Sequence, residues 1–336
     1  MSKYILKRLL SSLLVLLGVV VITFFIARVI PSNPAAKWVG PRATAEQVAA
    51  AEIQLGLDKP LVVQFFVYLR DLLRGDLGYS LSTKQPITAE LAAYVPATLE
   101  LVLIAFILAI VVGIPLGIYS AKKKDKALDH GARLFSIGAV SLPTFWVALA
   151  LQLIFYKGLG WLPLGGRIST TASIFETIPS VTGLLIFDCL ISGKFTLMLD
   201  ALKHIILPAF TISLYPIGLV ARMTRSALLE ILNEDYIVAS RSYGLRERKV
   251  LWKYALKNSL GPTATVVTLS MGYTLVNTFL VETIFSWPGI GSYVATSVTS
   301  LDYPAIMGVT LFSAVCYVLL NLVADIIITL DPRVRV

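Results

Sequence analysis

Six apolar segments without a single charged side chain constrain this chain more than any other feature. They cover residues 9–27, 101–121, 134–156, 205–221, 259–281 and 303–324. A helix needs about 20 mainly apolar residues to cross the hydrocarbon core of a bilayer, and these segments meet or approach that length. The composition agrees, since 57% of the 336 residues are hydrophobic and only 15% are charged. We therefore expect an all-α membrane protein with six transmembrane helices.

The placement of Lys and Arg predicts how these spans are oriented. Loops that stay in the cytoplasm retain positive side chains. Basic residues gather before the first span, after the second, after the fourth and at the C-terminal end, whereas residues 282–302 contain none. Both termini are therefore expected on the cytoplasmic side of the cell membrane, with membrane lipid around the spans. The net charge of +9 then reflects topology, and we expect no nucleic-acid partner.

The charge distribution also divides the chain into three parts. Residues 1–30 form an N-terminal tail and the first span, residues 31–96 form a charged extracytoplasmic subdomain, and residues 97–336 form the core with spans two to six. Mixed charge excludes the middle part from lipid, so it is either a solvated cap or a docking surface for an external partner. Helices are expected in it at 45–55 and 62–73.

A second outer excursion is expected between the third and fourth spans, over residues 161–203. Within it, the apolar stretch 178–187 is too short to cross a bilayer. It is predicted to be an interfacial or re-entrant segment.

A basic inner loop, residues 222–262, lies between the fourth and fifth spans. Apolar spacing predicts one helix over 224–243 and a second over 247–258, separated by Gly244, where glycine suits a positive φ. Such a loop either rests on anionic headgroups or docks a soluble partner. The residues alone leave both interpretations open.

The sequence shows no catalytic, metal-binding or nucleotide-binding motif. It has two histidines and two cysteines, and Gly193-Lys194 lacks the earlier glycine of a phosphate-binding loop. We expect neither a cofactor nor enzymatic activity in this chain. Asp325, near the inner end of the last span, favours a hydrogen bond to a neighbouring helix over a proton relay. Uphill transport would therefore need an ion gradient or another subunit.

Several stretches resemble one family. Residues 235–245 (DYIVASRSYGL), continued by residues 255–258 and Pro262, look like the EAA loop of binding-protein-dependent ABC transporter permeases, in the dipeptide, oligopeptide and nickel branch. Further stretches similar to the same branch are residues 4–10 (YILKRLL), 75–80 (GDLGYS), 141–146 (SLPTFW), 284–291 (IFSWPGIG), 302–304 (DYP) and 331–335 (DPRVR). The resemblance covers nearly the whole chain, and the last three motifs together are specific.

The resemblance implies a six-span permease with the type I ABC importer fold, which forms one half of a translocation pore. The implied partners are a second permease, two cytoplasmic ATPase subunits that bind ATP and Mg, and an extracytoplasmic solute-binding protein. The residues assigned to the ATPase-coupling loop are Ala239, Ser240, Arg241, Gly244, Leu245 and Arg246.

Two positions of this loop depart from the pattern. Val238 stands where the wider superfamily has an acidic residue, and Tyr243 where this branch often has Lys. These departures put in doubt a specific ion pair to the ATPase, but not docking itself.

Polar residues within the spans mark a candidate translocation pathway. Ser270, Thr274 and Asn277 recur along the fifth span, and Gln152 is an amide among apolar neighbours in the third. Each of them suits either the pathway or an interhelical hydrogen bond. Glycines and prolines in the spans suit either kinks for alternating access or close packing. They are Gly113, Pro115, Gly117, Pro143, Pro208 and Pro216.

The leading prediction is therefore the permease subunit of an ATP-driven importer that moves di- or oligopeptides by alternating access. Oligosaccharides and nickel chelates are alternative cargoes within the same class, although few Met, His and Cys residues disfavour direct metal ligation in the pore. An ion-coupled carrier and a non-transporting scaffold are the alternatives of other classes. The lack of charge pairs within the spans counts against the ion-coupled carrier.

Overall fold

The computed structural model describes residues 2–29, 33–175, 177 and 180–330. Within these residues the regular elements are helices, and an isolated bridge joins Tyr79 and Pro86. The chain forms two compact units. The first, here the core unit, comprises Ala97–Trp287 and Tyr317–Val336, and the second, here the N-terminal unit, comprises Ser2–Pro96 and Pro288–Cys316.

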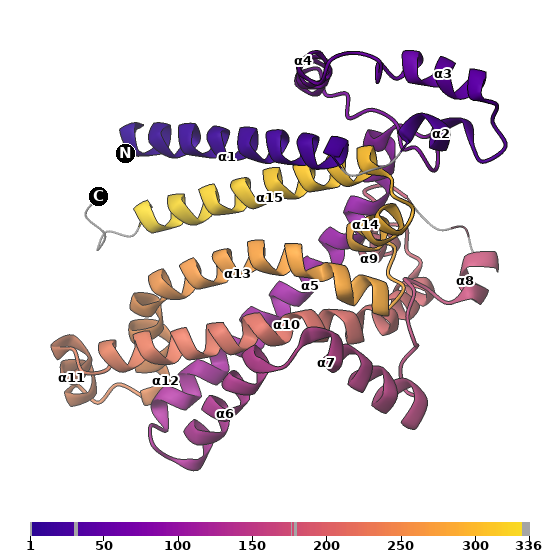
Figure 1. The fold of residues 1–336 in the computed structure, drawn as a ribbon. Helices are drawn as coiled ribbons and strands as arrows, with labels where there is room; N and C mark the ends of the chain where they lie inside the picture. The colour runs from indigo at the N-terminus through magenta and orange to yellow at the C-terminus, as the bar shows by residue number, and fades with distance from the viewer. Residues whose placement is uncertain (1, 30–32, 176, 178–179, 331–336) are drawn as a thin grey trace. The chain divides into compact units, whose positions relative to one another are not determined.

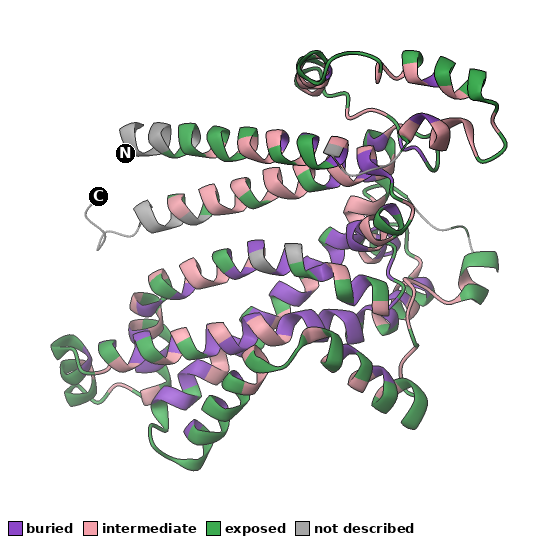
Figure 2. Cartoon of the chain, in the orientation of Figure 1, coloured by how far each residue is buried: buried purple, intermediate pink, exposed green. Residues whose placement is uncertain are grey.

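The core unit is organised around one long central helix, α10, shown in Figure 1. Its elements are most of α5 (Ile87–Lys122), α6 (Ala127–Ser141), α7 (Thr144–Leu151), the π-helix η1 (Gln152–Gly158), α8 (Thr170–Phe175), α9 (Leu185–Ile191), α10 (Phe195–Ile231), α11 (Asp235–Ser242), α12 (Glu247–Lys249), the π-helix η2 (Val250–Ala255), α13 (Leu256–Ile284) and the later part of α15 (Tyr303–Leu330). Buried residues follow α10 along its length, whereas α11 is mostly exposed (Figure 2).

Glycines bring α5 and α10 close together. A Cβ added at Gly113 would lie 2.9 Å from the Val220 side chain, and one at Gly117 would lie 2.6 Å from Cβ of Thr224 and 2.7 Å from the carbonyl oxygen of Ala221. Real Cβ atoms do not approach other atoms so closely. Both glycines therefore serve the close packing of these two helices.

The N-terminal unit contains α1 (Ser2–Val29), α2 (Pro34–Val39), α3 (Ala45–Gln54), α4 (Leu61–Leu73), α14 (Ile290–Thr299) and the first parts of α5 and α15. Local sequence explains two of these helix starts. Asn33 caps α2 ahead of a proline at its first position, and Thr44 with Gln47 forms a capping box at α3. The helices expected at 45–55 and 62–73 are present as α3 and α4.

Among the described residues, four helices are long and apolar enough to cross a membrane singly, within α1, α5, α10 and α15. Two bent pairs raise the number to six, in agreement with the six segments of the sequence. One pair is Ala127–Ser141 with Thr144–Gly158, at 106°, and the other is Glu247–Gly272 with Asn277–Ile284, at 59°.

The third predicted span, residues 134–156, is therefore two helices and not one continuous helix. Leu142 has φ −75° and ψ 134°, and Pro143 has φ −61° and ψ 126°. A proline ring clashes with a helical conformation of the preceding residue and has no N–H to donate, so the helix ends before it.

Two further expectations are corrected in the same unit. The helix predicted over 224–243 is divided, because α10 ends at Ile231 and Glu234 is extended before α11 begins. The helix predicted to end at 258 continues without interruption from α12 through η2 into α13, with Pro262 inside it. α10 begins at Phe195, within the expected outer excursion of residues 161–203, which stays a prediction.

The expected short apolar segment, 178–187, is described only in part. Ile178 and Pro179 lie outside the described residues, and α9 begins within the segment at Leu185. The motif at 331–335 also lies outside them.

Candidate coupling surface and translocation pocket

The predicted coupling loop folds into a corner between α11 and α12. Gly244 has φ +73°, as the sequence predicted, and its N–H donates to the Arg241 carbonyl at 2.9 Å. The Leu245 N–H donates to the Ser240 carbonyl at 3.3 Å. These bonds close the C-terminal end of α11 in the way glycine allows. A Cβ at Gly244 would meet no other atom within 4 Å, so the backbone conformation, not space, requires glycine here.

The buried face of the corner packs against residues of α5, α10 and η2. Ile237 of α11 is fully buried against Val250, Leu251 and Ala255, in a cluster that also contains Ile118, Ala121, Leu228 and Ile231. Leu245, one of the predicted coupling residues, packs against this cluster and is half-buried. The corner is therefore attached to the C-terminal ends of α5 and α10 by an apolar contact.

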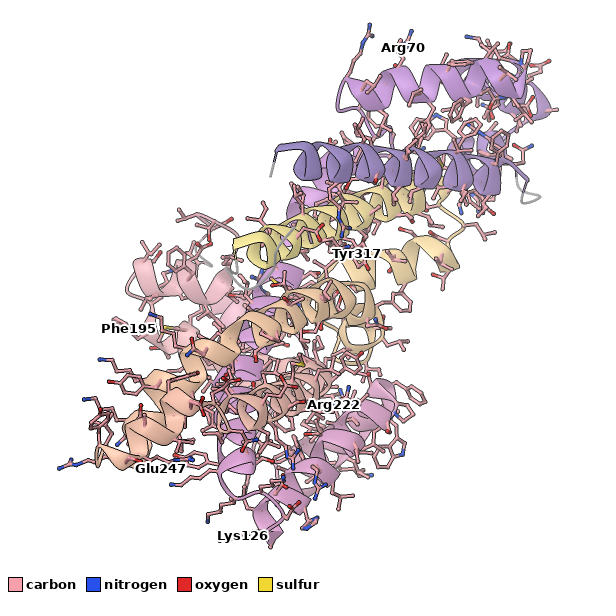
Figure 3. The ribbon with its side chains drawn as sticks, turned by 90° about the vertical axis from the view of Figure 1, so that its left-hand side faces the viewer. Arg70, Lys126, Phe195, Arg222, Glu247 and Tyr317 are labelled. Atoms are coloured by element: carbon pink, nitrogen blue, oxygen red, sulfur yellow. The ribbon has the colours of Figure 1, made fainter. Side chains whose placement is uncertain are left out.

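The solvent-exposed face of the corner carries the other predicted coupling residues. Ala239, Arg241, Gly244 and Arg246 are exposed, and Ser240 is half-buried. Arg241 forms an ion pair with Glu247, with Nη2 and Oε1 3.0 Å apart, which crosses the turn. Figure 3 shows Glu247 at the lower left of the ribbon in that view.

Two further residues on this face, which the sequence analysis did not assign to the coupling loop, are large and exposed. The side chain of Tyr243 is 86% exposed and that of Val238 is 51% exposed. Both are the positions where the loop departs from the family pattern. Helical periodicity could have identified Val238. Ile237 is the buried residue of α11, and the next residue, Val238, lies on a different side of the helix.

A buried ion pair holds three helices together near the C-terminal ends of α5 and α10. Asp129 of α6 is fully buried and accepts hydrogen bonds from Arg225 of α10, at 2.6 and 2.8 Å, and from Ser120 of α5, at 2.5 Å. Arg133 and Arg222 line a cavity of about 430 Å³ beside this pair. The sequence did not indicate the pair, because its two members are 96 positions apart.

Another polar cluster, at Glu100, joins α5 to the loops around it. Arg167 forms an ion pair with Glu100 at 2.5 Å and lies over the Trp287 ring. The Trp287 indole N–H donates to the Ala97 carbonyl at 2.9 Å. The tryptophan of the 284–291 motif thus fixes the end of α13 against α5.

The four predicted pathway residues have different surroundings. Gln152 is buried and donates to the carbonyls of Leu164, at 2.8 Å, and Ile284, at 3.2 Å. Ser270 donates to the Val267 carbonyl within its own helix. Thr274 and Asn277 alone of the four line a common cavity, of about 260 Å³. The sequence left two roles open for Gln152, a place in the pathway or a hydrogen bond between helices. Its bond to Ile284 is a hydrogen bond of the second kind.

No group of three His, Cys, Asp or Glu residues that could hold a metal ion occurs in the part of the chain that the structure describes. The corner and the cavity contain hydroxyl, amide, aromatic and cationic groups instead. Such groups can bind a partner protein or a polar solute.

Comparison with known proteins gives matches over the whole chain. The family model described as "Binding-protein-dependent transport system inner membrane component" matches residues 113–336, and the corresponding N-terminal model matches residues 1–102. The probable D,D-dipeptide transport system permease protein DdpB of Escherichia coli K12 is 44% identical over 322 residues, which are 96% of this chain and 94% of that protein. The dipeptide transport system permease protein DppB of Alkalihalophilus pseudofirmus is 42% identical over 336 residues, the full length of both chains.

A solved structure shows the same kind of fold. The chain is similar to a protein chain in the inward-facing MetNI methionine ABC transporter, with a TM-score of 0.50 and 15% sequence identity. The match covers 73% of this chain and 97% of that one.

Proposed function

Because the chain belongs to the family of inner membrane components of binding-protein-dependent transport systems, we propose that it is the permease subunit of an ATP-driven importer of small peptides. The relatives named above are dipeptide permeases, and they match this chain at 42% to 44% identity over nearly its full length. That likeness supports a peptide cargo over an oligosaccharide or a nickel chelate.

The observation that carries the proposal is the corner formed by α11 and α12. It projects from the core unit, exposes Tyr243, Val238, Arg241 and Arg246, and is packed from beneath by Ile237 and Leu245. A soluble ATPase would contact the exposed face, with Ala239 and Gly244 allowing close approach and Ser240 at its edge. A displacement of the corner would pass to α5 and α10 through the apolar cluster below it.

The proposed function requires several partner subunits. ATP and Mg would be held by two cytoplasmic ATPase subunits, a second permease would complete the pore, and an extracytoplasmic binding protein would deliver the peptide. Both termini and the corner would then be cytoplasmic. Residues 31–96 would lie outside, with α2, α3 and α4 available to the binding protein.

The spans would supply the pathway. Thr274 and Asn277 line a cavity and are proposed to face the solute, whereas Gln152 would hold neighbouring elements together and Ser270 would bond within α13.

The test is peptide uptake by the reconstituted complex in proteoliposomes, with all subunits and the binding protein present. Uptake should require ATP and survive an ionophore that dissipates the ion gradients. Uptake that stops with the ionophore and continues without ATP would instead identify an ion-coupled carrier.

A glycine pair gives a matched control for the coupling corner. Gly244 and Gly193 both have positive φ, +73° and +68°, and a Cβ added at either position would meet no other atom within 4 Å. Gly244→Arg should abolish uptake while membrane insertion is retained, because the new side chain covers the docking face. Gly193→Arg carries the same backbone strain at the turn before α10 and should transport normally. Normal transport by Gly244→Arg would show that the corner is not the coupling site.

A further inference from the structure

The cavity of about 260 Å³ lies beside a break between two helices and a bend in another helix of the core unit. Its lining residues are Ala139, Val140, Ser141, Leu142, Pro143, Thr144, Ile212, Tyr215, Thr274 and Asn277. They come from the break between α6 and α7, from the middle of α10, and from α13 at its bend. Figure 1 shows α7 and α13 on different sides of α10 in the core unit.

Three backbone features lie beside the cavity. Pro143 stands between α6 and α7, which meet at an angle of 106°. The α13 segment bends by 59° between Gly272 and Asn277. Tyr215 precedes Pro216 inside the continuous helix α10. The cavity is thus lined by residues from the break, from the bend and from the proline-containing stretch of α10.

Broken helices leave backbone groups that need a polar environment. The last carbonyls of α6 and the first N–H groups of α7 have no partner within their own helices, and no side chain caps α7 at Pro143. Unsatisfied groups of this kind cost several kcal/mol each in hydrocarbon, so irregular backbone at membrane depth is tolerated where it lines a wet cavity or is buried in protein. The backbone at this break is therefore suited to contact with a polar group in the cavity.

The side chains around the cavity are polar but uncharged. Ser141, Thr144, Tyr215, Thr274 and Asn277 carry hydroxyl or amide groups, and none of the ten lining residues is charged. Lipid-facing positions avoid such groups. Neutral donors and acceptors match a peptide bond, which presents one N–H and one C=O. They offer no ion pair to a charged side chain.

We infer that this cavity is a transient subsite for the backbone of the transported peptide, bound through its amide groups. The inference rests on the proposed function. Pockets for whole small molecules occupy about 300–1,000 Å³, so a cavity of about 260 Å³ holds part of a peptide. Recognition of the backbone alone gives every peptide the same contacts. Weak neutral bonds also let the solute leave, which passage through a membrane requires.

Two threonines of α13 provide matched variants. Thr274 and Thr278 are both buried, and each donates its hydroxyl to a carbonyl of its own helix, but only Thr274 lines the cavity. In the complete reconstituted complex, Thr274→Val combined with Asn277→Ala should lower dipeptide uptake at saturating binding protein about tenfold, through lost hydrogen bonds. Thr278→Val should transport like the unaltered chain. ATPase stimulation by the loaded binding protein should persist in all of them.

A second measurement requires no variant. A dipeptide that carries a photoactivatable diazirine side chain, delivered by the binding protein during ATP hydrolysis, should cross-link to residues 139–144 or 274–277, mapped by mass spectrometry. Normal uptake by the double variant, or equal loss in Thr278→Val, would overturn the subsite, as would cross-links confined to other segments. The proposed function would stand in those cases. Both the proposed function and the subsite would be contradicted if the unaltered complex showed no ATP-dependent uptake.

Discussion

Asp129 is the charged residue whose removal should cost the core unit the most. Its carboxylate is fully buried and bonded to Arg225 and Ser120, and the Arg225 side chain is only 18% exposed. Asp129→Asn leaves the guanidinium without its counter-charge, which should reduce the free energy of unfolding by about 3–5 kcal/mol. Denaturant titration of the detergent-solubilised protein measures this change.

The control is an exposed pair elsewhere in the chain. Asp71 forms an ion pair with Arg70, whose side chain is 57% exposed, so Asp71→Asn should cost about 1 kcal/mol or less. Replacing both buried charges, with Asp129→Leu and Arg225→Met, should recover most of the stability, because two matched apolar groups need no counter-charge. A double variant with a lower free energy of unfolding than Asp129→Leu alone and Arg225→Met alone would contradict this account.

Asp188 provides a pH-dependent contact in the loop before α9. It is fully buried, and it accepts the N–H groups of Val181, Thr182 and Gly183. Burial alone raises the pKa of Asp188, but the hydrogen bonds from Thr182, Val181 and Gly183 together outweigh it and hold the pKa below its ordinary value. A depressed carboxyl pKa stabilises the fold above the unfolded pKa of about 3.9, and this contribution is lost as the pH falls below that value.

Amide hydrogen exchange tests this contact directly. The amides of Thr182 and Gly183 should be protected at about pH 5, and their protection relative to the intrinsic rate should fall below about pH 3.9. Asp188→Asn should expose them already at the higher pH. Protection that is unchanged between about pH 5 and about pH 3 would show that the carboxylate does not hold this loop.

At the scale of elements, the corner of α11 and α12 should depend on aromatic contact more than on charge. Tyr243 is 86% exposed in the free chain, and buried aromatic residues dominate binding energy at protein interfaces. Tyr243→Ala should weaken binding of the isolated ATPase subunit about tenfold or more, measured by microscale thermophoresis in detergent. Tyr119→Ala, at a 46% exposed tyrosine on α5, should leave the affinity unchanged. Equal losses in both variants would point to a general effect on the protein.

The sequence predicted elements where a local signal was complete. Each of the six spans is an uncharged apolar run, and Gly244 supplies the positive φ that ends α11. The break at Leu142 and Pro143 was visible as a proline, but its 106° angle depends on the packing of α6 and α7 against α10. The split between α10 and α11 was missed because apolar spacing continues across the short turn between them. Pairs such as Asp129 with Arg225 need tertiary structure and have no local signal.

At the scale of the whole molecule, the contacts of the core unit favour movement as one body. Three contacts join α5 to its neighbours. Glu100 pairs with Arg167, Ser120 near the C-terminal end of α5 bonds to Asp129, and Gly113 and Gly117 between them approach α10 closely. Packed helices of this kind have few alternative arrangements. Access would then alternate through motion of this unit against the second permease, which inverted or paired transporter halves commonly use.

Spin-label distances in the complete importer test that motion. Ile107 of α5 and Phe210 of α10 are exposed, at 59% and 40%, and cysteines there carry labels without disturbing buried contacts. The distance between them should stay constant from the nucleotide-free to the ATP-trapped state, whereas a label at Ile107 paired with one on the second permease should change its distance. A shift within the 107–210 pair as large as that between the subunits would show that α5 and α10 separate during transport. The glycine contacts would then be a hinge, and Gly117→Ala, which forces the helices apart, would change transport more than stability.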